Sequence, residues 1–113
     1  MNESATWRSL RNAMPADCFA QRIESTIGTG IPDVIVISES LGTFWIELKG
    51  EGGRMRPTQL AWQNIAHRHG AKIFHIYKKR EGWLVISFAP DCETSAFVKK
   101  AGDVWAQIAS WIS

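Results

Sequence analysis

The sequence has few of the residues that cross-link small proteins and only short apolar runs. Cys18 and Cys92 are its two cysteines. They have no metal-ligand spacing and form at most one disulfide, which argues against a disulfide scaffold or zinc finger and favours free thiols. The longest apolar runs, Val34 to Ile37 and Trp83 to Ile86, have four residues each, whereas a membrane-spanning helix needs about 20. We therefore expect no membrane partner.

The chain also lacks internal repeats, low-complexity tracts and Pro/Ser-rich linkers. Its first residues, Met1 to Ser4, include an acid and lack the basic start and apolar stretch of a secretory signal, so we expect a cytoplasmic protein. Hydrophobic residues make up 45% and charged residues 21% of the 113 residues, which is ordinary globular usage. The sequence predicts one folded domain over residues 1–113.

Net charge is small, +2, but its distribution is uneven. Residues 1–48 carry three bases and six acids, residues 49–80 carry eight bases and one acid, and residues 81–113 carry two bases and four acids. The basic middle third is typical of a phosphate-binding face, and equally of a solvated basic surface. Charge alone leaves both interpretations open.

Hydrophobic periodicity predicts a single α/β domain with a central mixed sheet flanked by helices. Pro57 is a favoured first helical residue and Gly70 a favoured terminator. The predicted order is α-β-β-β-α-β-β-α, with helices over 4–13 and 57–69 and strands over 19–24, 33–37, 43–49, 71–77 and 83–88. Leu60, Trp62 and Ile65 give the middle helix an apolar side. A final amphipathic helix is predicted from the helical spacing of Phe97, Ala101, Val104, Trp105, Ile108 and Ile112.

Two carboxylates are predicted to meet across the hairpin of the second and third strands. If the hairpin turns near Ser40, Asp33 lies opposite Glu47, where like charges are destabilising unless a cation lies between them. Alternation along the strand puts Lys49 on the face of Glu47 and turns Leu48 into the core. This arrangement suits Mg²⁺ and phosphodiester hydrolysis. The alternative interpretation is that Asp33 and Glu47 are acids at strand ends and that Lys49 is their salt-bridge partner.

The same residues resemble a known motif. Gly30-Ile31-Pro32-Asp33, followed after thirteen residues by Glu47-Leu48-Lys49, resembles the motif of the PD-(D/E)XK nuclease superfamily. The chain is most similar to its small VRR-NUC and Holliday-junction-resolvase-like members, which include stand-alone phage proteins. The similarity runs from about Arg22 to Tyr77 and includes Gln59 and Trp62.

The resemblance implies a role for each matching residue. Asp33 and Glu47 match the metal-binding acids, the backbone carbonyl of Leu48 matches a further ligand, and Lys49 matches the catalytic lysine. Glu24 matches an acid that many relatives bring to the metal directly or through water. Gln59 matches a glutamine near the site whose role varies. The implied cofactor is Mg²⁺, with Mn²⁺ as a substitute, and the implied fold is the α-β-β-β-α-β core with an extra strand and a C-terminal helix.

Basic and polar residues around this motif predict contacts with a nucleic-acid backbone. Arg54 and Arg56 follow the acidic pair, Thr58 lies in the first turn of the next helix, and Lys72 extends the basic track. The alternative is that several are solvated charges. We favour that alternative for a predicted hairpin tip that consists of Lys78, Lys79 and Arg80.

Other residues are not assigned to the site. His67, His69 and His75 are expected to be surface or partly buried residues. Glu51 is within reach of a metal but is more simply a solvated loop acid. Trp45 shares the face of Glu47 and either walls the cleft or packs beneath the first helix.

The predicted function is a metal-dependent, structure-selective DNA endonuclease. The resemblance implies branched DNA such as Holliday junctions, and a homodimer with two active sites. The first or last helix would supply the dimer interface, unless its apolar residues only pack in the core. For a phage protein the location would be the host cytoplasm. The alternatives are a catalytically inactive nucleic-acid-binding module, or a nuclease with the same site that acts on other DNA or RNA.

Overall fold

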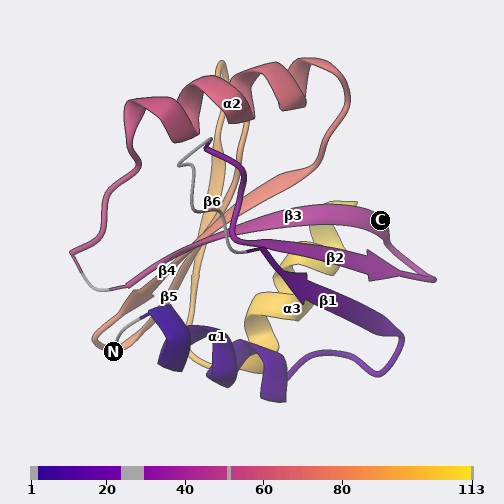
Figure 1. Ribbon diagram of the computed structural model, residues 1–113. Coiled ribbons are helices and arrows are strands. Elements are labelled where there is room, and N and C mark those ends of the chain that lie inside the picture. Colours follow the sequence, from indigo (N-terminus) through magenta and orange to yellow (C-terminus); the bar gives the residue numbers. More distant parts are fainter. Residues whose placement is uncertain (1–2, 24–29, 51, 113) are drawn as a thin grey trace.

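A computed structural model describes residues 3–23, 30–50 and 52–112 (Figure 1). The sheet follows the strand order β1-β2-β3-β4-β5-β6, and neighbours are antiparallel except β3 and β4, which are parallel. The elements along the chain are α1 Glu3–Asn12, β1 Cys18–Arg22, β2 Val34–Ser38, β3 Gly42–Lys49, α2 Pro57–Arg68, β4 Ile73–Lys79, β5 Gly82–Ser87, β6 Thr94–Val98 and α3 Ala101–Ile112. This confirms the predicted α/β class.

The helices divide between the two faces of the sheet. Helix α2 connects the parallel strands β3 and β4 and lies on one face, while α1 and α3 lie on the other (Figure 1). In the described part of the chain, no helix has the length and hydropathy needed to cross a bilayer. Cys18 and Cys92 are both free thiols, as predicted.

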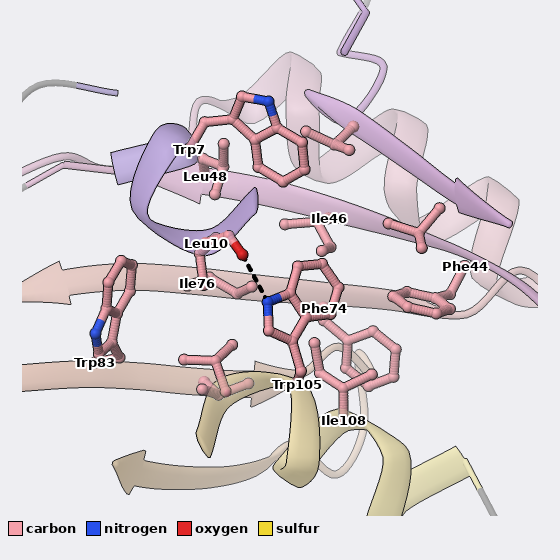
Figure 2. Close-up of a cluster of buried hydrophobic side chains, with 14 residues drawn as sticks. Trp7, Leu10, Phe44, Ile46, Leu48, Phe74, Ile76, Trp83, Trp105 and Ile108 are labelled. Atoms are coloured by element: carbon pink, nitrogen blue, oxygen red, sulfur yellow. Dashed lines mark hydrogen bonds between the residues drawn. The ribbon is translucent and has the colours of Figure 1, made fainter. Parts of the chain in front are cut away.

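The hydrophobic core fills the space between the sheet and the α1–α3 layer (Figure 2). Alternate residues of β2, β3 and β4 point into it, and the indole Nε1 of Trp105 donates a hydrogen bond of 2.8 Å to the carbonyl oxygen of Leu10, which links α3 to α1. The main core side chains are Trp7, Leu10, Val34, Val36, Phe44, Ile46, Leu48, Phe74, Ile76, Trp83, Val85, Val104, Trp105 and Ile108. The alternate residues of the same strands therefore face α2, on the other side of the sheet.

The last third of the chain contains a strand that the periodicity did not predict. Strand β6 pairs with β5 and includes Phe97, which we had assigned to the final helix. Phe97 lies four positions before Ala101, so its spacing fits a helix equally well. Tertiary packing decides for a strand, because the Phe97 ring lies over Gly82, where an added Cβ would be 2.7 Å from the ring. Across the described residues the sheet thus has six strands in place of the predicted five.

The prediction that α2 packs through an apolar side is wrong. Leu60 and Ile65 are 38% and 53% exposed, whereas the buried residues of the helix are Gln59 and Gln63. Because the sheet face beneath α2 carries Glu47 and His75, which are themselves buried, the helix packs on that face through amides. This contact makes α2 part of a polar site.

The apolar residues of the first and last helices pack in the core. Leu10 and Ile108 have no exposed surface, and Trp105 is also buried. Trp111 and Ile112 pack against the same cluster. Core packing therefore accounts for Leu10, Trp105 and Ile108, whereas Trp111 and Ile112 are partly buried at the edge of the core.

Candidate active site

The register of the β2–β3 hairpin agrees with the sequence prediction. Val34 pairs with Ile46 and Val36 with Phe44, so the next position along the register places Asp33 beside Glu47. A carboxylate oxygen of Asp33, Oδ2, accepts a hydrogen bond of 2.8 Å from the backbone N–H of Leu48. Asp33 is thereby fixed to the strand that carries Glu47 and Lys49.

A glycine positions the segment before Asp33. Gly30 has φ +86°, a left-handed conformation that favours glycine. A Cβ at this position would lie 2.3 Å from the carbonyl oxygen of Thr58, in the first turn of α2. The Gly-x-Pro-Asp turn therefore packs directly on the helix backbone, which explains why position 30 is a glycine.

Glu47 is the buried centre of the site, with no exposed surface. Its Oε2 accepts a hydrogen bond of 3.0 Å from Gln59 Nε2, and its Oε1 accepts one of 3.3 Å from Gln63 Nε2. Lys49 Nζ lies 3.4 Å from Oε2. Two amides and one ammonium group therefore hold this carboxylate.

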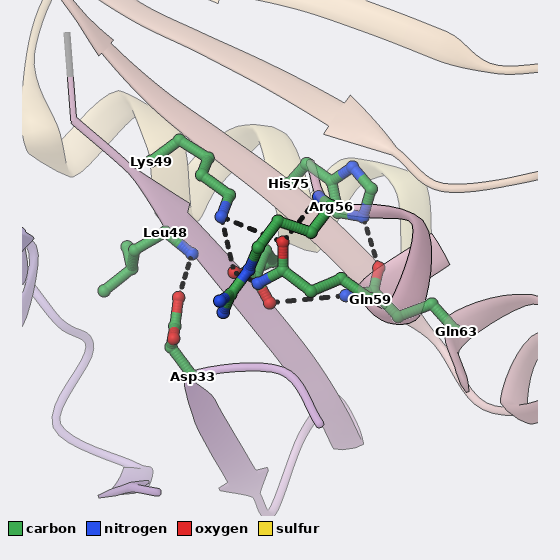
Figure 3. A network of polar contacts seen from close by, with 8 residues as sticks. Asp33, Leu48, Lys49, Arg56, Gln59, Gln63 and His75 are labelled. Atoms are coloured by element: carbon green, nitrogen blue, oxygen red, sulfur yellow. Dashed lines mark hydrogen bonds and ion pairs between the residues drawn. The ribbon is translucent and has the colours of Figure 1, made fainter. Parts of the chain in front are cut away.

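Gln59 connects the carboxylate to the start of α2 (Figure 3). Its Oε1 accepts hydrogen bonds from Lys49 Nζ at 3.1 Å and from the backbone N–H of Arg56 at 2.8 Å. The second bond is one half of a capping box, because Arg56 is the N-cap and Gln59 the third helical residue. Gln59, the glutamine expected near the site, thus holds Lys49 and caps the start of α2 through the same oxygen atom.

His75 belongs to the same network and is buried, so the expectation of a surface or partly buried residue is wrong. It is 3% exposed, neighbours Glu47 across the parallel β3–β4 pair, and its Nε2 lies 2.5 Å from Gln63 Oε1. Because Gln63 donates through Nε2 to Glu47, its Oε1 is an acceptor, so His75 Nε2 carries the hydrogen. Burial, and then the charge of Lys49, lowers the pKa of His75 to about 4.

Two signals in the sequence could have found this part of the network. Gln59 and Gln63 are four positions apart and so share one helix face. His75 alternates with the core residues Phe74 and Ile76 on its strand, which places it on the opposite face, under α2.

The environment of Glu47 disfavours its ionised form. Burial, and then the nearby charge of Asp33, raises the pKa of Glu47 to about 8, although Lys49 opposes both effects. A single ammonium group therefore does not balance the two carboxylates.

Asp33 and Glu47 together fit a hard divalent cation. Both supply oxygen donors, and their repulsion is what a divalent charge would relieve. Within residues 3–23, 30–50 and 52–112, no group of three or more His, Cys, Asp and Glu side chains could hold a metal. Glu24, predicted as a further acid, and Glu51 lie outside those residues. The described ligand set is thus the pair of carboxylates.

The residues expected to contact nucleic acid occupy two places. Arg54, Arg56 and Thr58 are exposed at the start of α2, next to the Lys49–Gln59 pair. Lys72 is exposed at the start of β4, whereas Lys49 pairs with Tyr77 near the end of that strand. Lys72 lies five positions before Tyr77 and three before His75, the partner of Glu47, or about 16 Å and about 10 Å along the strand, so Lys72 is not part of the Glu47 cluster.

Several other residues named in the sequence analysis contact neighbouring side chains or the backbone away from the Glu47 cluster. Trp45 packs edge to face on Trp62 of α2, with ring centroids 5.7 Å apart, so it does not lie beneath the first helix. His67 packs edge to face on Phe88. Lys79 and Arg80 are exposed at the β4–β5 turn, as expected for solvated charges, whereas Lys78 Nζ donates to the carbonyl oxygens of Lys79 and Gly82.

Comparison with known families agrees with this geometry. No curated protein matches the chain. The family model of the VRR-NUC domain matches residues 1–79, which extend from α1 to the last residue of β4 and include every residue of the Glu47 cluster. The chain therefore belongs to the VRR-NUC family of PD-(D/E)XK-type nuclease domains.

Proposed function

We propose that this nuclease domain is a Mg²⁺-dependent endonuclease that hydrolyses phosphodiester bonds in DNA. Its active site would consist of Asp33, Glu47 and Lys49. The observation that carries the proposal is the pair of neighbouring carboxylates with Lys49 Nζ 3.4 Å from one of them. This combination provides oxygen ligands for a cation and a positive group beside the reacting phosphate.

Each residue has a distinct part in this proposal. Asp33 and Glu47 would hold the cation, and the carbonyl of Leu48 and the carboxylate of Glu24 are proposed as additional ligands. A bound divalent cation supplies polarisation of a phosphoryl oxygen and acidifies water. Lys49 orients the attacking water and offsets negative charge as it develops. Gln59 is a positioning residue, since its Oε1 accepts the hydrogen bond from Lys49 Nζ at 3.1 Å.

DNA would approach over the start of α2. Arg54 and Arg56 supply positive charge there, and the exposed Thr58 lies at the helix N-terminus, where backbone N–H groups favour phosphate. Contacts of this kind are independent of base sequence and weaken steeply with salt. These contacts would place the sugar-phosphate backbone of the DNA next to the Lys49–Gln59 pair.

The resemblance to resolvase-like nucleases supplies the finer parts of the proposal. The proposed substrate is branched DNA such as four-way junctions, and Mn²⁺ is proposed as a substitute cofactor. We further propose a homodimer with one active site for each of two strands. It would act in the cytoplasm, which for a phage protein is the host cytoplasm.

One cleavage assay tests the activity and the substrate class. Labelled four-way junction, linear DNA duplex and structured RNA are incubated with the protein and either Mg²⁺ or excess chelator. We expect cleavage of the junction that depends on Mg²⁺, with less cleavage of linear duplex and RNA. Binding with no metal-dependent cleavage of any substrate would indicate an inactive nucleic-acid-binding module and contradict the proposal. Preferential cleavage of RNA would contradict the assignment of DNA.

A further inference from the structure

A groove lies beside the Glu47 cluster, between the second half of α2 and the start of β3 and β4. Its volume is about 480 Å³, within the range of small-ligand sites. Its lining includes Trp45 and Trp62 together with Thr43, His69 and Lys72. None of the residues assigned to the cleavage site lines it, except Lys72, which the geometry separates from the Glu47 cluster.

The two indole rings have the chemistry of a stacking site. They contact each other edge to face at an interplanar angle of 71°, and each side chain is only partly buried. An aromatic ring that is fixed by a neighbour and open on one side offers a π-face to a planar ligand. Nucleobases stack on such faces with little dependence on sequence.

The charges around the groove favour an anionic ligand. Lys72 is exposed on the lining, and His69 is exposed at the end of α2. Among the described residues that line the groove, no side chain carries a negative charge. A ligand with a planar ring and a phosphate group matches this combination of two indoles and a cation.

The groove also adjoins the cleavage site. Trp45 lies two residues before Glu47 on the same face of β3, which is about 7 Å along the strand, and Trp62 immediately precedes Gln63 in α2. Nucleotides in a duplex rise about 3.4 Å each along one strand. The groove is therefore about two nucleotides from the residues that would hold the scissile phosphate.

We propose that the Trp45–Trp62 groove binds an unpaired nucleobase of the DNA substrate, with the adjoining phosphate on Lys72. This inference rests on the proposed function, because it takes DNA as the ligand. Bases within a paired duplex are stacked on their neighbours, so only an unpaired or displaced base would enter. The groove would thus favour DNA with an unpaired nucleotide about two positions from the cut.

The test uses two hairpin duplexes that differ at one bulged position, which carries either thymidine or an abasic residue. Both contain the same phosphates, so their difference in affinity measures the base alone. Binding is followed by fluorescence anisotropy in excess chelator, where no metal-dependent cleavage occurs. We expect the wild type to bind the thymidine bulge about 5- to 150-fold more tightly than the abasic bulge.

Four substitutions identify the groove as the source of that difference. Trp62→Leu keeps an apolar side chain without a π-face and should bind both hairpins equally, whereas Trp62→Phe should retain most of the preference. Ile65→Ala is the matched control, because Ile65 is an exposed apolar residue of α2 outside the groove lining. Lys72→Ala should weaken binding of both hairpins alike and reduce the salt dependence.

Equal affinity of the wild type for the two hairpins, or a preference that survives Trp62→Leu, would overturn the inference. A change of oligomeric state in Trp62→Leu, with base discrimination intact, would mean that a second copy of the chain covers the groove, and would also overturn it. Failure of the proposed function is distinguishable, because base discrimination without any cleavage refutes the nuclease proposal and leaves the binding site standing.

Discussion

Replacement of Glu47 by glutamine should abolish metal-dependent cleavage and remove a pH dependence from the stability of the metal-free protein. Glutamine has nearly the same shape as glutamate, but it cannot carry the negative charge that a cation requires. The buried carboxyl of the wild type has its pKa raised to about 8 by burial and by Asp33. The folded protein therefore retains a proton that the unfolded chain releases above its ordinary pKa of 4.5.

The sign of the effect follows from this difference in bound protons. A raised carboxyl pKa gives a stability contribution that is complete below pH 4.5 and is lost as the pH rises to about 8. His75, whose pKa is lowered from 6.5 to about 4, contributes a gain in stability as the pH rises through that interval. The two effects oppose each other up to pH 6.5, so the loss from Glu47 becomes visible between pH 6.5 and 8.

The expected size is about 1.4 kcal/mol per pH unit, or about 2 kcal/mol between pH 6.5 and 8. Urea unfolding in chelator, followed by tryptophan fluorescence, measures the free energy of unfolding at each pH. The wild type should lose stability over this interval, while Glu47→Gln should not. Glu81→Gln, at an exposed acid of the β4–β5 turn, is the control and should follow the wild type. Parallel curves for the wild type and Glu47→Gln would contradict the assigned environment of Glu47.

Replacement of Lys49 by alanine should lower the cleavage rate by about 10²- to 10⁴-fold, the range for loss of a positioned catalytic group. Affinity for DNA in chelator should change little, because Lys49 is mostly buried and bonded to Glu47 and Gln59. Rate and affinity are measured on the same labelled junction. Full cleavage by Lys49→Ala would overturn the assigned role.

Two further variants separate chemistry from charge. Lys49→Arg keeps the positive charge but replaces a compact ammonium with a planar group, so it should not restore the rate. Lys99→Ala removes an exposed lysine that precedes α3 and should cut at the wild-type rate. If Lys49→Arg were fully active, the site would require only a positive charge at this position.

The register of the hairpin could be predicted because it depends on local features. A short loop after a β-branched strand fixes which residues pair, and one face of β3 is apolar through Phe44, Ile46 and Leu48. A slip of one residue would turn Glu47 and Lys49 toward the apolar core under α1 and α3, so the hydrophobic pattern specifies the position of Glu47 in the sheet.

Spacing places Gln59, Gln63 and His75 on the faces between α2 and the sheet, but their pairing with Glu47 and with one another could not be predicted in the same way. An apolar helix face was expected from Leu60 and Ile65, but these residues are exposed and the helix packs through Gln59 and Gln63. A buried polar layer has no hydrophobic period, and its satisfaction depends on contacts between residues far apart in the chain, such as His75 with Gln63. Strand β6 was missed because Phe97 fitted the spacing of the following helix.

The central claim is that Asp33 and Glu47 bind one divalent cation together, and titration calorimetry with Mn²⁺ alone at pH 8 tests it most directly. Wild-type protein, Asp33→Asn, Glu47→Gln and the exposed control Glu39→Gln would be compared. We expect the wild type and Glu39→Gln to bind Mn²⁺ equally, and each of the other two variants to bind at least about 10- to 100-fold more weakly. Equal affinity in all four proteins would contradict the claim.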